Sequence, residues 1–252
     1  MKKWQLISLL IFVYIIGLVV LFPARVVAAF APLPSTIQLG QINGSIWNGS
    51  VERLVISGGS DGDISLYDVE WRLSPLALLT LSAEVNVNIP AQQRNILQGS
   101  LTLNASNNAL SIRDARFAGD LEDLMLFSPI QTPIPIRGGL SLHVQEFILG
   151  QPFCSAMNGN ALGAQVNAQL GNQWQNLGDY ETQLGCAEGR LGIDMPHNNM
   201  LGLSITGWVS PNGVDLRIGI APTAEAPQGI RDLIEWFGEP DSQGRRYFNF
   251  RL

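Results

Sequence analysis

Apolar and polar residues alternate along much of this 252-residue chain, and this period of two constrains the fold more than any other feature. The longest run covers residues 81–89, and shorter runs cover 100–104, 140–145, 165–170 and 214–220. Successive side chains of a β-strand point to opposite faces, so each run presents one apolar face and one neutral polar face. The pattern predicts an all-β protein with a large sheet.

Pairs of turn-forming residues separate the runs, at Asp61-Gly62, Asn158-Gly159 and Asn212-Gly213. Such pairs predict tight turns between antiparallel strands. The apolar side of a large antiparallel sheet is covered by a second sheet, by short helices or by a molecule outside the chain. We expect the chain to cover it itself, as a sandwich or half-barrel with a few short helices.

A nearly unbroken apolar run, Trp4–Phe22, follows Met1-Lys2-Lys3. A run of this length predicts a transmembrane helix, because the apolar core of a secretory signal has only about 7 to 15 residues. Cleavage before Ala29 remains the alternative. Lys2 and Lys3 are the only lysines in the chain, and positive residues mark the cytoplasmic side. Residues 1–25 are therefore predicted to be a cytoplasmic stub and anchor, with the rest outside the cytoplasm.

The predicted exported part is acidic, since residues 26–252 hold 12 arginines and 21 acidic residues, a net charge of about −9. It lacks the basic stripe that neutralises phosphates, which argues against nucleic acid as a partner. Its cysteines, Cys154 and Cys186, are predicted to form a disulfide because exported thiols are oxidised. Their spacing does not fit a metal site.

Catalytic patterns are missing from the sequence. His143 and His197 are the only histidines, and neither is paired in sequence with a nucleophile or an orienting acid. No phosphate-binding or dinucleotide-binding motif occurs either. We therefore expect neither an enzyme nor a cofactor.

Three prolines, Pro129, Pro133 and Pro135, predict a connector over residues 129–135, because they cannot all lie in a central strand. The connector would separate a first β lobe, residues 26–128, from a second lobe with the disulfide, residues 136–252.

Two segments predict helices. Near the end, Ile230, Leu233, Ile234 and Phe237 follow helical spacing. This amphipathic helix either plugs an open end of the sheet, which we favour, or docks on a partner. A second short helix is expected at residues 74–79, where Pro75 suits a first helical position.

A resemblance to a known family rests on two motifs. The stretch Gly44-Ser45-Ile46-Trp47-Asn48-Gly49 resembles the Gly-Thr-Val-Trp-Ser-Gly signature of the type II secretion system protein N family, also called general secretion pathway protein N. Residues 69–79, with Trp71 and Pro75, resemble its second motif, and the ending at residues 244–248 is also similar.

The resemblance implies a single-pass protein of the bacterial inner membrane that helps to export folded proteins across the outer membrane. It implies action by binding, with periplasmic domains of inner-membrane platform subunits as partners and the outer-membrane channel as a further candidate. Gly44 and Gly49 are expected to allow positive φ or close backbone approach, and Trp47 and Trp71 to fill the apolar side of the sheet. The alternative is an anchored β-groove that carries lipid or another apolar ligand.

Overall fold

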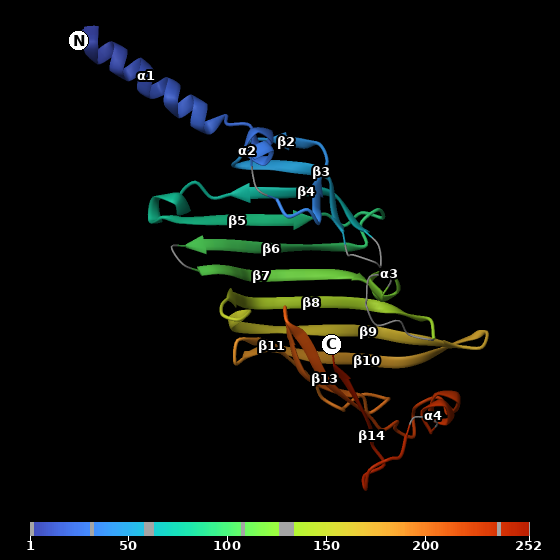
Figure 1. The fold of residues 1–252 in the computed structure, drawn as a ribbon. Coiled ribbons are helices and arrows are strands. Elements are labelled where there is room, and N and C mark those ends of the chain that lie inside the picture. Colours follow the sequence, from blue (N-terminus) through green and yellow to red (C-terminus); the bar gives the residue numbers. More distant parts are fainter. Residues whose placement is uncertain are drawn as a thin grey trace.

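The computed structural model describes residues 3–30, 33–57, 63–106, 109–125, 134–235 and 238–251. Fourteen strands form one antiparallel sheet in which neighbours in sequence are almost always neighbours in space. Figure 1 shows them stacked one after another from the N-terminal end. The strands are β1 (Ile37–Leu39), β2 (Ile42–Gly44), β3 (Asn48–Ser57), β4 (Asp63–Leu73), β5 (Ser82–Ile89), β6 (Leu97–Ser106), β7 (Ala109–Asp120), β8 (Ile136–Leu149), β9 (Cys154–Leu170), β10 (Gln173–Ala187), β11 (Arg190–Met195), β12 (Ser204–Ser210), β13 (Gly213–Ile220) and β14 (Arg246–Arg251).

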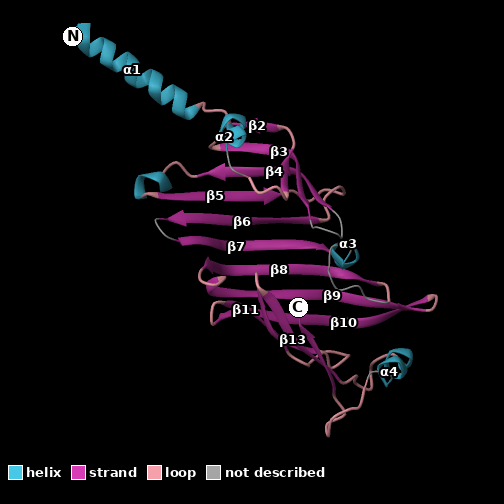
Figure 2. Cartoon of the chain, in the orientation of Figure 1, coloured by secondary structure: helices cyan, strands magenta, loops and turns pink. Residues whose placement is uncertain are grey.

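Helices are few and lie around the sheet, as Figure 2 shows. They are α1 (Lys3–Val20), α2 (Ala24–Phe30), the 3-10 helix η2 (Ala77–Thr80), α3 (Leu121–Met125) and α4 (Gln228–Glu235). Within the described residues, no helix meets the combined requirement of length and apolar character for a membrane crossing.

The prediction of an all-β fold on a large antiparallel sheet is confirmed. Asn212-Gly213 lies where a turn was expected, since it leads from β12 into β13. The turn predicted at Asn158-Gly159 is wrong. Both residues lie inside the long strand β9 and pair with β8 on one side and β10 on the other. Pairing on both sides outweighs the local turn preference of the dipeptide. Asp61-Gly62 lies outside the described residues.

The sheet continues across the predicted connector. Most of residues 129–135 lie outside the described part, but the strands on either side, β7 and β8, pair with each other from Ser111–Ile148 to Asp120–Gly139. The two predicted lobes therefore share one sheet. Each has its own buried cluster: one around Leu66, Val69 and Ile89, the other around Val166 and Tyr180.

The first cluster forms because the β3–β4 hairpin bends out of the sheet. β4 pairs with β5 only from Glu70 to Leu73, so its earlier residues have no partner in β5. Leu66 in that part packs in a cluster with Phe117 of β7, which is three strands away in the sheet. The outer half of the hairpin therefore covers part of the apolar face.

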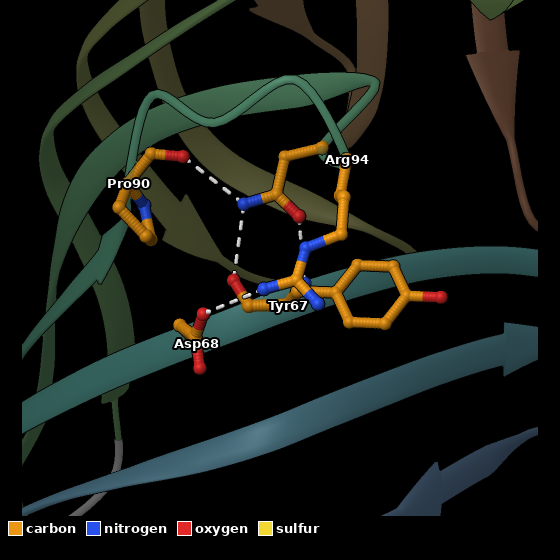
Figure 3. Close-up of polar contacts among 5 residues, drawn as sticks. Tyr67, Asp68, Pro90 and Arg94 are labelled. Carbon is orange, nitrogen blue, oxygen red and sulfur yellow. Dashed lines mark hydrogen bonds and ion pairs between the residues drawn. The ribbon is translucent and has the colours of Figure 1, made fainter.

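Figure 3 shows how the bend is held. The Asn95 side chain accepts a hydrogen bond from the Tyr67 amide (2.6 Å) and donates to the carbonyl oxygens of Tyr67 and Pro90 (3.0 Å each). The Asn95 side chain thereby makes the two backbone hydrogen bonds that a residue of β5 would otherwise make with Tyr67. Asp68 adopts a positive φ of 54° at the bend, and Arg94 pairs with it across 3.5 Å while lying over the Tyr67 ring.

The second cluster forms at the other end, where β11 to β14 turn across the face of β9 and β10 (Figure 1) and α4 packs on the sheet. Among the described residues, the chain therefore covers the apolar face of its own sheet only at these two ends, and not along its whole length as expected. The accessible surface is 16236 Å², whereas a compact protein of 27.4 kDa would expose about 11,000 Å². The single layer and the projecting α1 account for this large surface.

Candidate functional site

The first family motif forms the turn between β2 and β3. The amide of Ser45 donates to the carbonyl oxygen of Asn48 (2.9 Å), so Asn43-Gly44 and Asn48-Gly49 flank the turn. Gly44 has a φ of 91°, which disfavours any residue with a side chain. A Cβ atom there would also lie 2.5 Å from the Asn48 carbonyl oxygen.

Gly49 of the same motif contacts the second motif directly. A Cβ atom on Gly49 would lie 2.3 Å from the carbonyl oxygen of Asn43 and 2.4 Å from the Trp71 ring. The Trp71 indole therefore sits against bare backbone and donates from Nε1 to the carbonyl oxygen of Ile46 (3.3 Å). The two motifs, whose nearest ends are 20 residues apart in sequence, form one packed unit.

Trp47 joins this unit to the N-terminal helix. Its indole Nε1 donates to the carbonyl oxygen of Val19 at the end of α1 (2.8 Å), and its own carbonyl oxygen accepts from the amide of Leu73 (2.7 Å). The Ile46 amide donates to the carbonyl oxygen of Phe22 (3.0 Å) as well. Trp47 was expected to fill the apolar side of the sheet. Its indole N–H donates to a carbonyl at the end of α1, which also accepts a longer hydrogen bond from the Phe22 amide (3.4 Å).

The second motif continues into the β4–β5 connection. Pro75 lies in the turn before η2, so the expected short helix is a 3-10 turn that starts two residues later. The hydroxyls of Thr80 and Ser82 both donate hydrogen bonds to the Ala77 carbonyl oxygen (2.8 and 3.0 Å) and so hold the end of this 3-10 turn. Four leucines on this connection are exposed: Leu76 (73%), Leu78 (42%), Leu79 (80%) and Leu81 (74%). Sequence reasoning took the first three only as part of a helix signal and placed Leu81 at the start of the strand over residues 81–89.

The amphipathic helix forms as α4, Gln228–Glu235. Ile230 and Ile234 are buried and pack in the cluster around Tyr180, whereas Leu233 is exposed. Phe237 lies outside the described residues. Two of the four predicted docking residues therefore face the sheet, which favours the interpretation of α4 as a cover.

The predicted disulfide is present and joins Cys154, at the start of β9, to Cys186, near the end of β10. Cys154 is almost completely buried. Within the described residues, the structure contains no group of three or more metal-ligating side chains. His143 and His197 lie on β8 and in the loop after β11, and the Nε2 atom of His143 is buried without a partner in the described structure.

His143 belongs to a continuous polar row on the face opposite the apolar clusters. Cross-strand register places one polar residue per strand in this row, from β2 to β14: Asn43, Ser50, Glu70, Asn88, Ser100, Arg116, His143, Asn160, Gln183, Asp194, Thr206, Arg217 and Asn249. Most of these residues are exposed. The row gives the sheet one wide surface of mostly neutral hydrogen-bonding groups.

Comparison with known proteins agrees with the motifs. The family model described as "Type II secretion system (T2SS), protein N" matches residues 35–249. Type II secretion system protein N of Aeromonas hydrophila is 30% identical, over 97% of this chain and 96% of its own. The proteins of the same name from Vibrio cholerae and Pectobacterium carotovorum are 24% and 27% identical, over 92% and 91% of this chain and 91% and 88% of their own. No solved structure matches the chain. The chain thus belongs to the type II secretion system protein N family.

Proposed function

We propose that this protein is a non-enzymatic component of the type II secretion system, held in the inner membrane by residues 4–22 with its sheet in the periplasm. There it takes part in the export of folded proteins through contacts with periplasmic domains of the platform subunits. Family membership over residues 35–249 supports the place in the secretion system. The anchor and its orientation rest on the apolar run Trp4–Phe22 and on Lys2 and Lys3.

The observation that carries the binding role is the polar row across the sheet. Protein contacts that form and dissociate use surfaces that are no more apolar than the rest of the protein, with hydrogen bonds spread over a wide area. Exposed Gln183, Asp194 and Thr206 lie side by side in register and offer such groups on adjacent strands. We assign the contact with platform subunits to this face.

A photo-crosslinking residue at Gln183 tests this role in cells that contain the complete secretion system. We expect adducts with a platform subunit, identified by mass spectrometry, and their loss in cells that lack the platform subunits. The matched control is Asn172, which is also exposed but lies in the β9–β10 turn away from the row. Adducts at Asn172 but none at Gln183 would refute the assignment to the polar face.

The second candidate function is the binding of lipid or another apolar ligand. Its support is the single-layer sheet, in which the two buried clusters cover separate parts of the apolar face. Native mass spectrometry of the full chain, released from mild detergent in the gas phase, distinguishes the two functions. A stoichiometric lipid that survives release would favour the ligand-binding role, and the bare chain would favour the scaffold role.

A further inference from the structure

The exposed apolar side chains of the sheet gather at one edge. Among the described residues between 34 and 232, all exposed large apolar side chains lie there, and we call them the leucine rim: Leu76, Leu78, Leu79, Leu81, Leu110 and Leu149. The other exposed large apolar residues after this range belong to α4 and β14: Leu233, Tyr247 and Phe248.

Strand direction and register place the rim on one line. The first four leucines lie between the end of β4 and the start of β5, Leu110 lies at the start of β7 and Leu149 ends β8. Ala83, two residues after Leu81, pairs with Ala105, which pairs with Leu110. The pair Ser111–Ile148 then connects this line to the end of β8. The rim thus continues over four neighbouring strands, β5 to β8.

The rim lies at the same edge as the end of α1. Leu73, the last residue of β4 before the rim, donates its amide proton to Trp47, and Trp47 donates to the Val19 carbonyl oxygen at the end of α1. In Figure 1 the β4–β5 connection projects from the side of the sheet toward which α1 extends. An α1 helix held in a bilayer would therefore keep this edge at the membrane surface.

The chemistry of the edge fits a bilayer. Residues 73–83, 95–112 and 147–155 contain no Asp, Glu, Lys or Arg, although the chain as a whole is acidic. Charged groups resist entry into the interface, whereas leucines on exposed turns gain by leaving water there. Exposed apolar side chains in this number on one edge are also unusual for a surface that faces only water.

We propose that the leucine rim inserts into the periplasmic leaflet of the membrane that holds α1, as a second membrane contact that fixes the sheet's orientation on the bilayer. The inference rests on the anchor put forward as part of the proposed function. With two contacts, the sheet cannot rotate freely about the end of α1. The polar row of the sheet is then held at a fixed angle to the membrane. This orientation would present it to platform subunits in the same membrane.

A single-site fluorescence experiment tests this contact with the full chain in vesicles of phosphatidylethanolamine and phosphatidylglycerol. The described residues contain no free cysteine, so Leu79→Cys introduces a single labelling site for a polarity-sensitive dye. Nitroxide groups on the lipid acyl chains quench dyes that enter the bilayer. Asn172→Cys, at the opposite edge, is the matched negative control, and Ile11→Cys reports on α1 itself.

We expect the dye at Leu79 to be quenched several-fold more than the dye at Asn172, and to emit at shorter wavelength. Leu81→Cys should behave in the same way, which guards against a local defect at Leu79. Equal quenching at Leu79 and Asn172, with strong quenching at Ile11, would overturn the rim contact and leave the anchor standing. Quenching at Leu79 without quenching at Ile11 would refute the anchor, and with it the arrangement of two contacts, and would leave the rim as a membrane contact of its own.

Discussion

The indole of Trp47 donates a hydrogen bond from Nε1 to the carbonyl oxygen of Val19, 2.8 Å away and 28 residues earlier in the chain. The last carbonyls of a helix have no partner within the helix, so a side chain that reaches one of them stabilises the helix end. Here the donor belongs to the family motif, and the contact sets where the N-terminal helix leaves the sheet.

Trp47→Phe keeps an aromatic ring but removes this donor. We expect a local loss of about 0.5–1.5 kcal/mol, because the Val19 carbonyl keeps only the longer hydrogen bond from the Phe22 amide (3.4 Å). Limited proteolysis of the full chain in detergent should then cleave faster between residues 20 and 36. Trp208→Phe is the control, because Trp208 lies on β12 and contacts Arg190, far from α1 in the sequence. Equal cleavage rates in both variants would contradict the role of Trp47 as a tether.

Gly49→Ala tests the close packing of the two motifs. The added methyl group would overlap the Asn43 carbonyl and the Trp71 ring, so we expect a loss of about 1–3 kcal/mol in the free energy of unfolding. The matched control is Gly185→Ala in β10, where nothing lies within 4 Å of the new Cβ atom. Urea unfolding curves give both values, and a loss at Gly185 as large as at Gly49 would count against the packing argument.

Ile234→Ala and Leu233→Ala separate the two interpretations of α4. Ile234 is buried against the sheet and Leu233 is exposed, so we expect losses of about 2–5 kcal/mol and less than about 1 kcal/mol, respectively. Thermal unfolding measures both variants. If Leu233→Ala abolished secretion while the protein kept its stability and cellular level, α4 would be a docking helix as well as a cover.

Tyr180 makes the stability sensitive to alkaline pH. Burial raises the pKa of its hydroxyl to about 12, and the hydroxyl donates to the Leu177 carbonyl oxygen (3.1 Å). Unfolded tyrosine ionises near pH 10, so this stability is fully present below about pH 10 and is lost as the pH rises toward 12. The loss should reach at most about 3 kcal/mol in urea unfolding curves. Tyr180→Phe should remove this part of the pH dependence, and an unchanged profile would refute it.

The disulfide should be a large part of the total stability. Cys154 and Cys186 are 32 residues apart, and closing a loop of this size contributes about 3–4 kcal/mol in the chain-entropy model. Replacing both by Ser should lower the melting temperature of the full chain by several degrees or more. The Ser155→Ala variant, next to Cys154, is the control. Both cysteines found reactive toward a thiol reagent in protein from intact cells would contradict an oxidised, exported domain.

The sequence by itself determined the all-β class, five of the strands, the disulfide partners and the family. Alternation over residues 81–89 can bury one face only in a strand, and two cysteines in a chain that is predicted to be exported leave one pairing. The helical spacing of Ile230 and Ile234 likewise predicts α4 without tertiary information. These features depend on local geometry or on simple chemistry.

Only the tertiary structure decided how these elements combine. A period of two shows which face of a strand is apolar, but not what covers that face. The pattern therefore could not distinguish a single sheet whose two ends fold over its apolar face from a sandwich of two sheets. Asn158-Gly159 has the same local preference as a turn pair, yet pairing with β8 and β10 holds it in a strand. The direction of the Trp47 indole depends on where the end of α1 lies, and that position is fixed by contacts between residues far apart in the sequence.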